Sequence, residues 1–176
     1  MRLITSHDFI VVHESAGWFG ELDFINQLHT QRGFPVGRLN NSCGYHNIIL
    51  NGYRDYNELE AKRYRPDLDG KNIMARQEDE QGCHVQGLNA RSLGICLIGK
   101  FGSLIPSIPQ CIALFNQLVV WCKRYGIPPD RVVSHSEAQG MPGTSFKAPD
   151  GRKECPGSAL DITWVRNNIW RLSQAA

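Results

Sequence analysis

Three side chains of types that bind transition metals lie far apart in the sequence. His13 follows the apolar run Phe9–Val12, and His135 follows Val132–Val133, two runs that predict buried strands. Cys155 lies in a polar, basic stretch, which is a poor place for a packing residue and a good place for a metal-bound or reactive thiolate. Two imidazoles and one thiolate leave a fourth position of tetrahedral zinc open, as catalytic zinc sites require. The three residues are therefore candidates for a zinc site: His13, His135 and Cys155.

The spacing of these residues does not decide the matter by itself. The sequence contains no His-x-x-x-His or Cys-x-x-Cys pair, so each histidine could equally be a hydrogen-bonded polar residue of a strand or loop. Cys155 paired with His135 would also suit a cysteine hydrolase. The two chemistries differ in a testable way, because a chelator inactivates a zinc enzyme and a thiol-alkylating reagent inactivates a cysteine enzyme.

The elements that must position these residues alternate between strand and helix. This order predicts one α/β domain over residues 1–176, with a mixed central β-sheet flanked by helices. Ser92–Ile98 is apolar throughout, which predicts the central strand. The helix that Pro109 opens has the clearest pattern: Ser107 is a plausible N-cap, and Gly126 ends the helix. The other elements we expect are strands over 9–12, 45–50 and 132–133 and helices over 22–28 and 158–172.

Two stretches lack a regular pattern. Residues 53–81 are predicted to form a surface excursion with a short hairpin near Gly70. Residues 136–154, rich in Gly and Pro, are predicted to form a loop. Since that loop begins and ends at proposed metal ligands, we expect it to form one wall of a substrate groove.

Composition excludes several classes of function. The chain of 176 residues is 41% hydrophobic and 20% charged, and its net charge of +2 is far from the clustered positive charge of a nucleic-acid-binding protein. No secretory signal and no membrane-spanning segment is predicted. We therefore expect a protein that is made in a bacterial or host cytoplasm, does not insert into membranes, and keeps its six cysteines unpaired.

Six segments, in order along the chain, carry a resemblance to a known family. They are Ile10–His13, Gly44–Ile49, Gly82–Asn89 (a Gly-x-His-x-x-Gly-x-Asn motif), Arg91–Gly99, Ser134–His135 and Lys153–Gly157. The chain resembles the zinc-dependent N-acetylmuramoyl-L-alanine amidases of type 2, which share a fold with peptidoglycan recognition proteins. The resemblance covers about residues 8–170.

This resemblance implies roles for five residues. His13, His135 and Cys155 match the family's zinc ligands, and Tyr45 and Lys153 match two further catalytic positions. Lys153 lies two residues before Cys155, so in an extended segment its ammonium would lie beside the metal and stabilise an oxyanion. Tyr45, on a strand that we expect to neighbour His13, would donate a hydrogen bond to the same oxygen or position the water.

Other residues of the motifs have less specific expectations. His84 and Asn89 are expected to line the substrate groove or to support a strand. His46 is expected to point away from Tyr45, by strand alternation, and to have a structural role. Glu14 is expected to be either a neighbour of the metal site or exposed. Two histidines are expected at the surface: His7 and His29.

The function that the resemblance implies is hydrolysis of the amide bond between N-acetylmuramic acid and L-alanine in peptidoglycan. A single catalytic domain without an export signal resembles monomeric phage endolysins, which depend on a holin to reach the periplasm. A cytoplasmic muropeptide-recycling amidase is the alternative with the same chemistry. A non-catalytic peptidoglycan-binding module is less favoured, because family members that only bind commonly lack the cysteine ligand and Cys155 is present.

Overall fold

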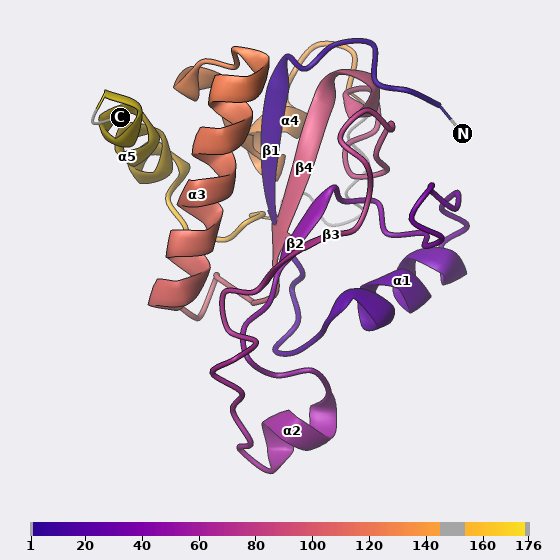
Figure 1. Cartoon of the computed structure of the whole chain (residues 1–176), viewed down its shortest axis with the longest axis vertical. Helices are drawn as coiled ribbons and strands as arrows, with labels where there is room; N and C mark the ends of the chain where they lie inside the picture. The colour runs from indigo at the N-terminus through magenta and orange to yellow at the C-terminus, as the bar shows by residue number, and fades with distance from the viewer. Residues whose placement is uncertain (1, 145–153, 175–176) are drawn as a thin grey trace.

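A mixed five-stranded sheet organises the chain, as expected (Figure 1). The computed structural model describes residues 2–144 and 154–174. The strand order is β3-β2-β4-β1-β5; β1 pairs in parallel with β4 and β5, β2 pairs in parallel with β4, and β3 pairs antiparallel with β2. The strands are β1 (Phe9–Glu14), β2 (Asn47–Ile49), β3 (Asn72–Met74), β4 (Ser92–Leu97) and β5 (Val132–Ser134).

Helices cover both faces of this sheet. Figure 1 shows α3 and α5 on one side of it and α1 on the other. None of the helices within the described residues is long and apolar enough to span a membrane. The helices are α1 (Leu22–Gln31), α2 (Tyr56–Glu60), α3 (Ile108–Tyr125), α4 (His135–Gln139) and α5 (Ile162–Gln174), with short 3-10 turns at Asn89–Arg91 and Pro129–Arg131.

Strand β1 separates the hydrophobic core from the face that carries chemistry. Ile10 and Val12 point into the core that α3 and α5 cover, whereas Val11 packs in a separate cluster on the other face. By the alternation of a strand, His13 belongs to the same face as Val11. Strand β4 is buried along its whole length, which confirms its predicted place inside the sheet.

Helix α3 begins and ends as the sequence predicts. The Ser107 hydroxyl accepts the backbone N–H of Gln110, whose side chain accepts the backbone N–H of Ser107 in return, and Gly126 ends the helix with φ 64°. The apolar side chains of this helix do not all face the core. The helix buries Leu114, Leu118, Trp121 and Cys122, whereas Ile108 and Ile112 are 77% and 56% exposed, because the sheet meets only one face of the helix.

Two predicted boundaries are wrong near the proposed site. Tyr45 and His46 precede β2, because the carbonyl of His46 accepts two successive amides, those of Ala75 and Arg76, and this irregularity interrupts the regular ladder. The predicted loop 136–154 begins with helix α4. A reciprocal capping pair between Ser134 and Glu137 starts that helix, and the Ser-x-x-Glu spacing is the sequence signal of such a start.

Two further expectations need correction. The excursion 53–81 contains α2 and edge strand β3, so the antiparallel pair is formed by β2 and β3 and not by a short hairpin at Gly70. The last helix starts at Ile162 and not at Ser158. About half of the 136–154 stretch, residues 145–153, lies outside the described residues.

The packing of α3 on the sheet predicts the effect of two matched truncations. Leu118 is fully buried, so Leu118→Ala is expected to lower the free energy of unfolding by about 2–5 kcal/mol. Ile112→Ala on the same helix is expected to change it by about 0.5 kcal/mol or less, because that side chain is 56% exposed. Urea unfolding followed by circular dichroism measures both, and equal losses would contradict the observed packing.

Candidate metal centre

The structure brings together the three side chains proposed as metal ligands. One nitrogen of His13, one nitrogen of His135 and Sγ of Cys155 all lie within 4.8 Å of one another. They come from β1, from the first residue of α4 and from the segment before α5. No other such cluster occurs within residues 2–144 and 154–174.

Parallel strand pairing explains how the two histidines meet. Val12 of β1 is in register with Ser134 of β5, and the next residue in each chain segment is a histidine. Both imidazoles therefore emerge at the same end of neighbouring strands, with ring centroids 4.6 Å apart. His13 is buried, and His135 is partly buried.

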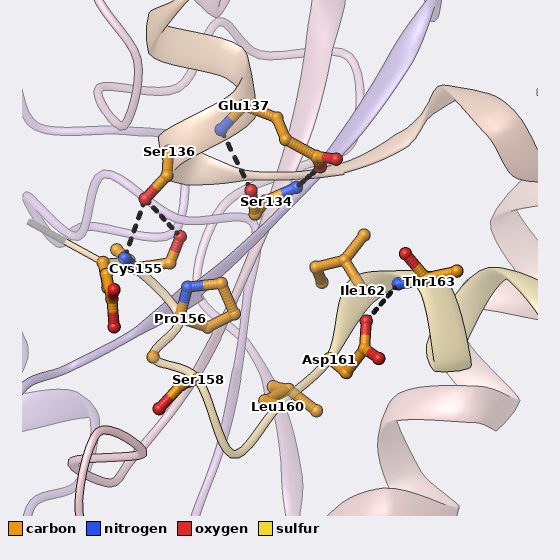
Figure 2. Close-up of a pocket in the computed structure, with 12 residues that line it drawn as sticks. Ser134, Ser136, Glu137, Cys155, Pro156, Ser158, Leu160, Asp161, Ile162 and Thr163 are labelled. Atoms are coloured by element: carbon orange, nitrogen blue, oxygen red, sulfur yellow. Dashed lines mark hydrogen bonds between the residues drawn. The ribbon is translucent and has the colours of Figure 1, made fainter.

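Cys155 is held in place through its backbone. Its N–H donates to the Ser136 hydroxyl at 2.9 Å, a bond drawn in Figure 2. Its carbonyl accepts the Ser136 N–H at 3.1 Å. The backbone N–H of Glu14 donates to Cys155 Sγ at 3.4 Å. An N–H directed at the sulfur favours its thiolate form, which is the form that binds metals.

Glu14 contributes a second link to the same region. Its carboxylate accepts the backbone N–H of Phe101, and the carbonyl of Phe101 accepts the N–H of Ala159, four residues after Cys155. Burial raises the pKa of Glu14, although the Phe101 amide opposes that shift. Of the two expectations for Glu14, the structure therefore favours the neighbour of the metal site.

An open cavity of about 380 Å³ lies beside Cys155 (Figure 2). Ser134 and Ser136 line one side of it, Pro156 follows the cysteine, and Asp161 and Ile162 mark the start of α5 on the opposite side. The close-up shows that the cavity separates the ligand-bearing segment from the beginning of that helix.

The electrostatics of the two histidines suit metal binding. Burial lowers the pKa of His13 well below its ordinary value, and the neighbouring imidazoles of His135 and His84 add to the effect. Burial also lowers the pKa of His135 to about 4. Both rings are therefore neutral near pH 7, and a neutral imidazole has the free lone pair that a metal requires.

These donors fit zinc. A thiolate with two imidazoles is a typical zinc donor set. With bond lengths of about 2.0–2.3 Å, tetrahedral ligands lie about 3.5 Å apart, so the observed separations of up to 4.8 Å require only a small contraction. The Glu14 amide already supports the thiolate.

Tyr45 lies beside the cluster, although not on a neighbouring strand. It precedes β2, which β4 separates from β1, yet its ring centroid is 5.0 Å from that of His13. Burial raises the pKa of Tyr45 well above its ordinary value, and the nearby thiols, with Cys96 the first of them, act in the same direction. The phenol therefore stays protonated and can donate a hydrogen bond. Lys153, the other proposed catalytic residue, lies outside the described residues.

The two residues expected in a groove have different surroundings. His84 Nδ1 lies 3.2 Å from His13 Nε2, so its ring contacts the cluster directly. The side chain of Asn89 accepts the backbone N–H groups of His84 and Val85 and so fixes the turn that carries this ring. Asn89 also lines a cavity of about 560 Å³, together with Val36, Cys83 and Gln86.

The prediction for His29 is wrong, because its side chain is buried and not at the surface. Nδ1 of His29 accepts the backbone N–H of Gly44 at 2.9 Å, and its ring packs on Tyr45. Sequence reasoning missed this residue, although its spacing of four from the buried Ile25 places both on one face of α1. His29 thereby supports the position of Tyr45.

Two other histidines lie away from the cluster. His46 has the predicted structural role: its Nδ1 accepts the N–H of Gly94, and its Nε2 bonds to the carbonyl of Glu80. Its ring lies 5.8 Å from that of His84 and 6.5 Å from that of Trp121, whereas the ring of Tyr45 lies against His13 and His29. His7, expected at the surface, is only partly exposed and stacks on Tyr125.

Comparison with known proteins identifies the family. The sequence profile of the N-acetylmuramoyl-L-alanine amidases matches residues 5–158. The chain belongs to this amidase family. No curated protein sequence gives a significant match to this amidase-family chain.

Solved structures share the fold of this amidase-family chain. N-acetylmuramoyl-L-alanine amidase LysC from Clostridium intestinale is 20% identical, with a TM-score of 0.70 over 96% of this chain and 90% of that one. Ph2119 endolysin from a Thermus scotoductus bacteriophage is 21% identical, with a TM-score of 0.61 over 93% and 84% of the two chains. Drosophila PGRP-LB is 19% identical, with a TM-score of 0.63 over 91% and 80%.

The buried His46 predicts a pH dependence of stability. Burial lowers the pKa of folded His46 to about 4, from 6.5 in the unfolded chain. Below pH 6.5 the unfolded chain binds a proton that the folded protein does not, so the free energy of unfolding falls as the pH falls from 6.5 toward 4. His46→Gln is expected to flatten this dependence by up to about 1.4 kcal/mol per pH unit. Urea unfolding of metal-free protein between pH 7 and 4.5 measures the slope, and identical slopes would contradict the assignment.

Proposed function

We propose that this chain is a zinc-dependent amidase that hydrolyses the bond between N-acetylmuramic acid and L-alanine in bacterial peptidoglycan. One observation carries the proposal: in a member of the amidase family, donor atoms of His13, His135 and Cys155 lie within 4.8 Å of one another. The three residues are separated in sequence, and packing requirements alone do not explain why two buried imidazoles and a thiol should converge.

The residues of the chain have distinct parts in this reaction. A zinc ion bound there would act as a Lewis acid and would lower the pKa of water toward neutrality. The protonated hydroxyl of Tyr45 would donate a hydrogen bond to the carbonyl oxygen as negative charge develops on it. We assign the same task to the ammonium of Lys153. His29 and the Glu14 amide hold Tyr45 and Cys155 in place.

The surroundings of the centre support a peptide-bearing substrate. The cavity of about 380 Å³ reaches Cys155, and the cavity of about 560 Å³ begins at Cys83, next to the histidine that contacts His13. Gln86 and Asn89, which line the second cavity, offer amide groups to the backbone of a stem peptide.

For the biological setting we propose a monomeric phage endolysin that depends on a holin for access to the wall. Two structures of similar fold are named as an endolysin amidase and a phage endolysin. A muropeptide-recycling amidase would use the same chemistry. A peptidoglycan recognition protein that only binds is the third option, and the complete set of His13, His135 and Cys155 argues against it.

Product analysis tests the reaction. Purified peptidoglycan is incubated with the protein, with and without a chelator. We expect new L-alanine N-termini and no new reducing sugar ends, with activity lost to the chelator and restored by zinc. New reducing ends would contradict the amidase assignment. Loss of activity to thiol alkylation together with indifference to the chelator would point to a cysteine hydrolase.

Replacement of the sulfur ligand tests the metal site. Cys155→Ser is expected to lose stoichiometric zinc and to show no activity above background, because a serine hydroxyl is a poor zinc ligand compared with a thiolate. Cys111→Ser, on α3 and outside the cluster, is the matched control and is expected to keep both. Zinc is measured by elemental analysis of the purified proteins; full zinc content in Cys155→Ser would refute the ligand assignment.

Removal of one hydroxyl tests Tyr45. Tyr45→Phe keeps the ring that packs against His13 and His29, so zinc content is expected to be unchanged. The kcat is expected to fall by about 10²–10³-fold, the usual effect of losing one oxyanion donor. Tyr64→Phe, whose hydroxyl bonds to Asp69 away from the centre, is the control. An unchanged kcat in Tyr45→Phe would mean that Tyr45 is only a packing residue.

A further inference from the structure

His84 has an unusual environment for a buried polar side chain. It is only 9% exposed, and within the described residues the one hydrogen bond of its ring joins Nδ1 to His13 Nε2 at 3.2 Å. Its other nitrogen, Nε2, is buried without a partner of normal hydrogen-bond geometry among the described residues, while the backbone of Ser92 acts to raise the pKa of the ring. An apolar side chain would fill this space without leaving a polar atom unpaired. The hydrogen bond to His13 is therefore the interaction that an imidazole makes at this position and an apolar side chain could not make.

Two glycines make the space for this ring. A Cβ atom on Gly94 would lie 2.8 Å from Cγ and Cδ2 of His84, and a Cβ atom on Gly82 would lie 2.6 Å from Cδ2. Both distances are too short for real contacts, so any side chain at either position would displace the imidazole. The Gly-x-His part of the motif and Gly94 of β4 thus form a cradle that fixes the orientation of the ring.

A hydrogen bond between the two histidines would decide which nitrogen of His13 is free to bind a metal. A neutral imidazole carries one proton, and a nitrogen that binds a metal must be the unprotonated one. Since Nε2 of His13 is engaged with His84, Nδ1 is the nitrogen left for the metal. In that state Nε2 of His13 carries the proton and donates it in a hydrogen bond to Nδ1 of His84, whose own proton is then on Nε2.

We propose that His84 is a positioning residue of the metal centre, whose Nδ1 accepts the Nε2–H of His13 and so presents His13 Nδ1 to zinc. This role replaces the expectation that His84 lines the groove, since its ring is almost fully buried. The inference rests on the proposed zinc function. Metal-binding histidines commonly depend on such a partner, and its loss typically weakens metal affinity about 10–100-fold.

Three substitutions at His84 test the hydrogen bond and not merely the shape. His84→Asn places its amide oxygen where Nδ1 was and is expected to keep most of the zinc affinity. His84→Leu removes the acceptor and is expected to lose about 10–100-fold. His84→Gln places its polar atoms near the former Nε2 and is expected to lose zinc affinity as His84→Leu does. Competition with a chromophoric chelator measures zinc affinity without any assay of activity.

His7→Leu provides the control for a histidine-to-leucine change, because the His7 ring stacks on Tyr125 and bonds to the carbonyl of Glu78, and neither residue is a proposed ligand. It is expected to bind zinc like the unaltered protein. Equal zinc affinity in all three His84 variants would overturn the inference. If the unaltered protein itself bound no zinc, the proposed function would fail, which is a different outcome.

A measurement on the unaltered protein keeps the test independent of whether the variants fold. Long-range ¹H–¹⁵N correlation spectra of the zinc-loaded protein report which imidazole nitrogens carry protons. We expect a protonated Nε2 and a metal-bound Nδ1 in His13, with an unprotonated Nδ1 in His84. A proton on Nδ1 of His84, or zinc on Nε2 of His13, would overturn the proposal.

Discussion

The parallel pairing of β1 with β4 and β5 is the constraint on which the rest of the structure depends. Because the strands run in the same direction, residues that follow the register pair Val12 and Ser134 emerge at the same end of the sheet. In the same register, His13 lies opposite Cys96 of β4. Of the nearby thiols, Cys96 is the one that raises the pKa of Tyr45 most. A shift of one residue would point the side chain of His13 into the apolar core under α3, so the core and the candidate metal site require the same register.

Burial then sets the chemistry of the side chains at this end of the sheet. The apolar surroundings that stabilise the fold also keep the imidazoles of His13 and His135 neutral and the phenol of Tyr45 protonated. Each of these states is the one that the proposed reaction needs. The surrounding hydrogen bonds, from the Glu14 amide to Cys155 and between His84 and His13, restrict how the ligands can turn. The site is thus ordered by groups that would not touch the substrate.

Sequence reasoning predicted the features that local patterns encode. The alternation of strands and helices gave the fold class, and capping at Ser107 gave the start of α3. It was less successful where tertiary contacts decide. His29 was predicted at the surface, but the packing of α1 buries it. Tyr45 contacts His13 although a strand lies between their segments in the sheet. The partnership of His84 with His13 joins residues 71 positions apart, and no local pattern predicts it.

The hydrogen bond between the Glu14 amide and Cys155 joins residues 141 positions apart, and it has a consequence for how the centre is assembled. About four-fifths of the chain lies between the two residues that this contact joins. In a nascent polypeptide the two histidines can meet before the cysteine has been synthesised, so the complete donor set exists only when the last helix is about to emerge. An ion bound there would act as a crosslink between the first strand and the C-terminal segment. Its effect on stability would come largely from the chain entropy that the unfolded state loses.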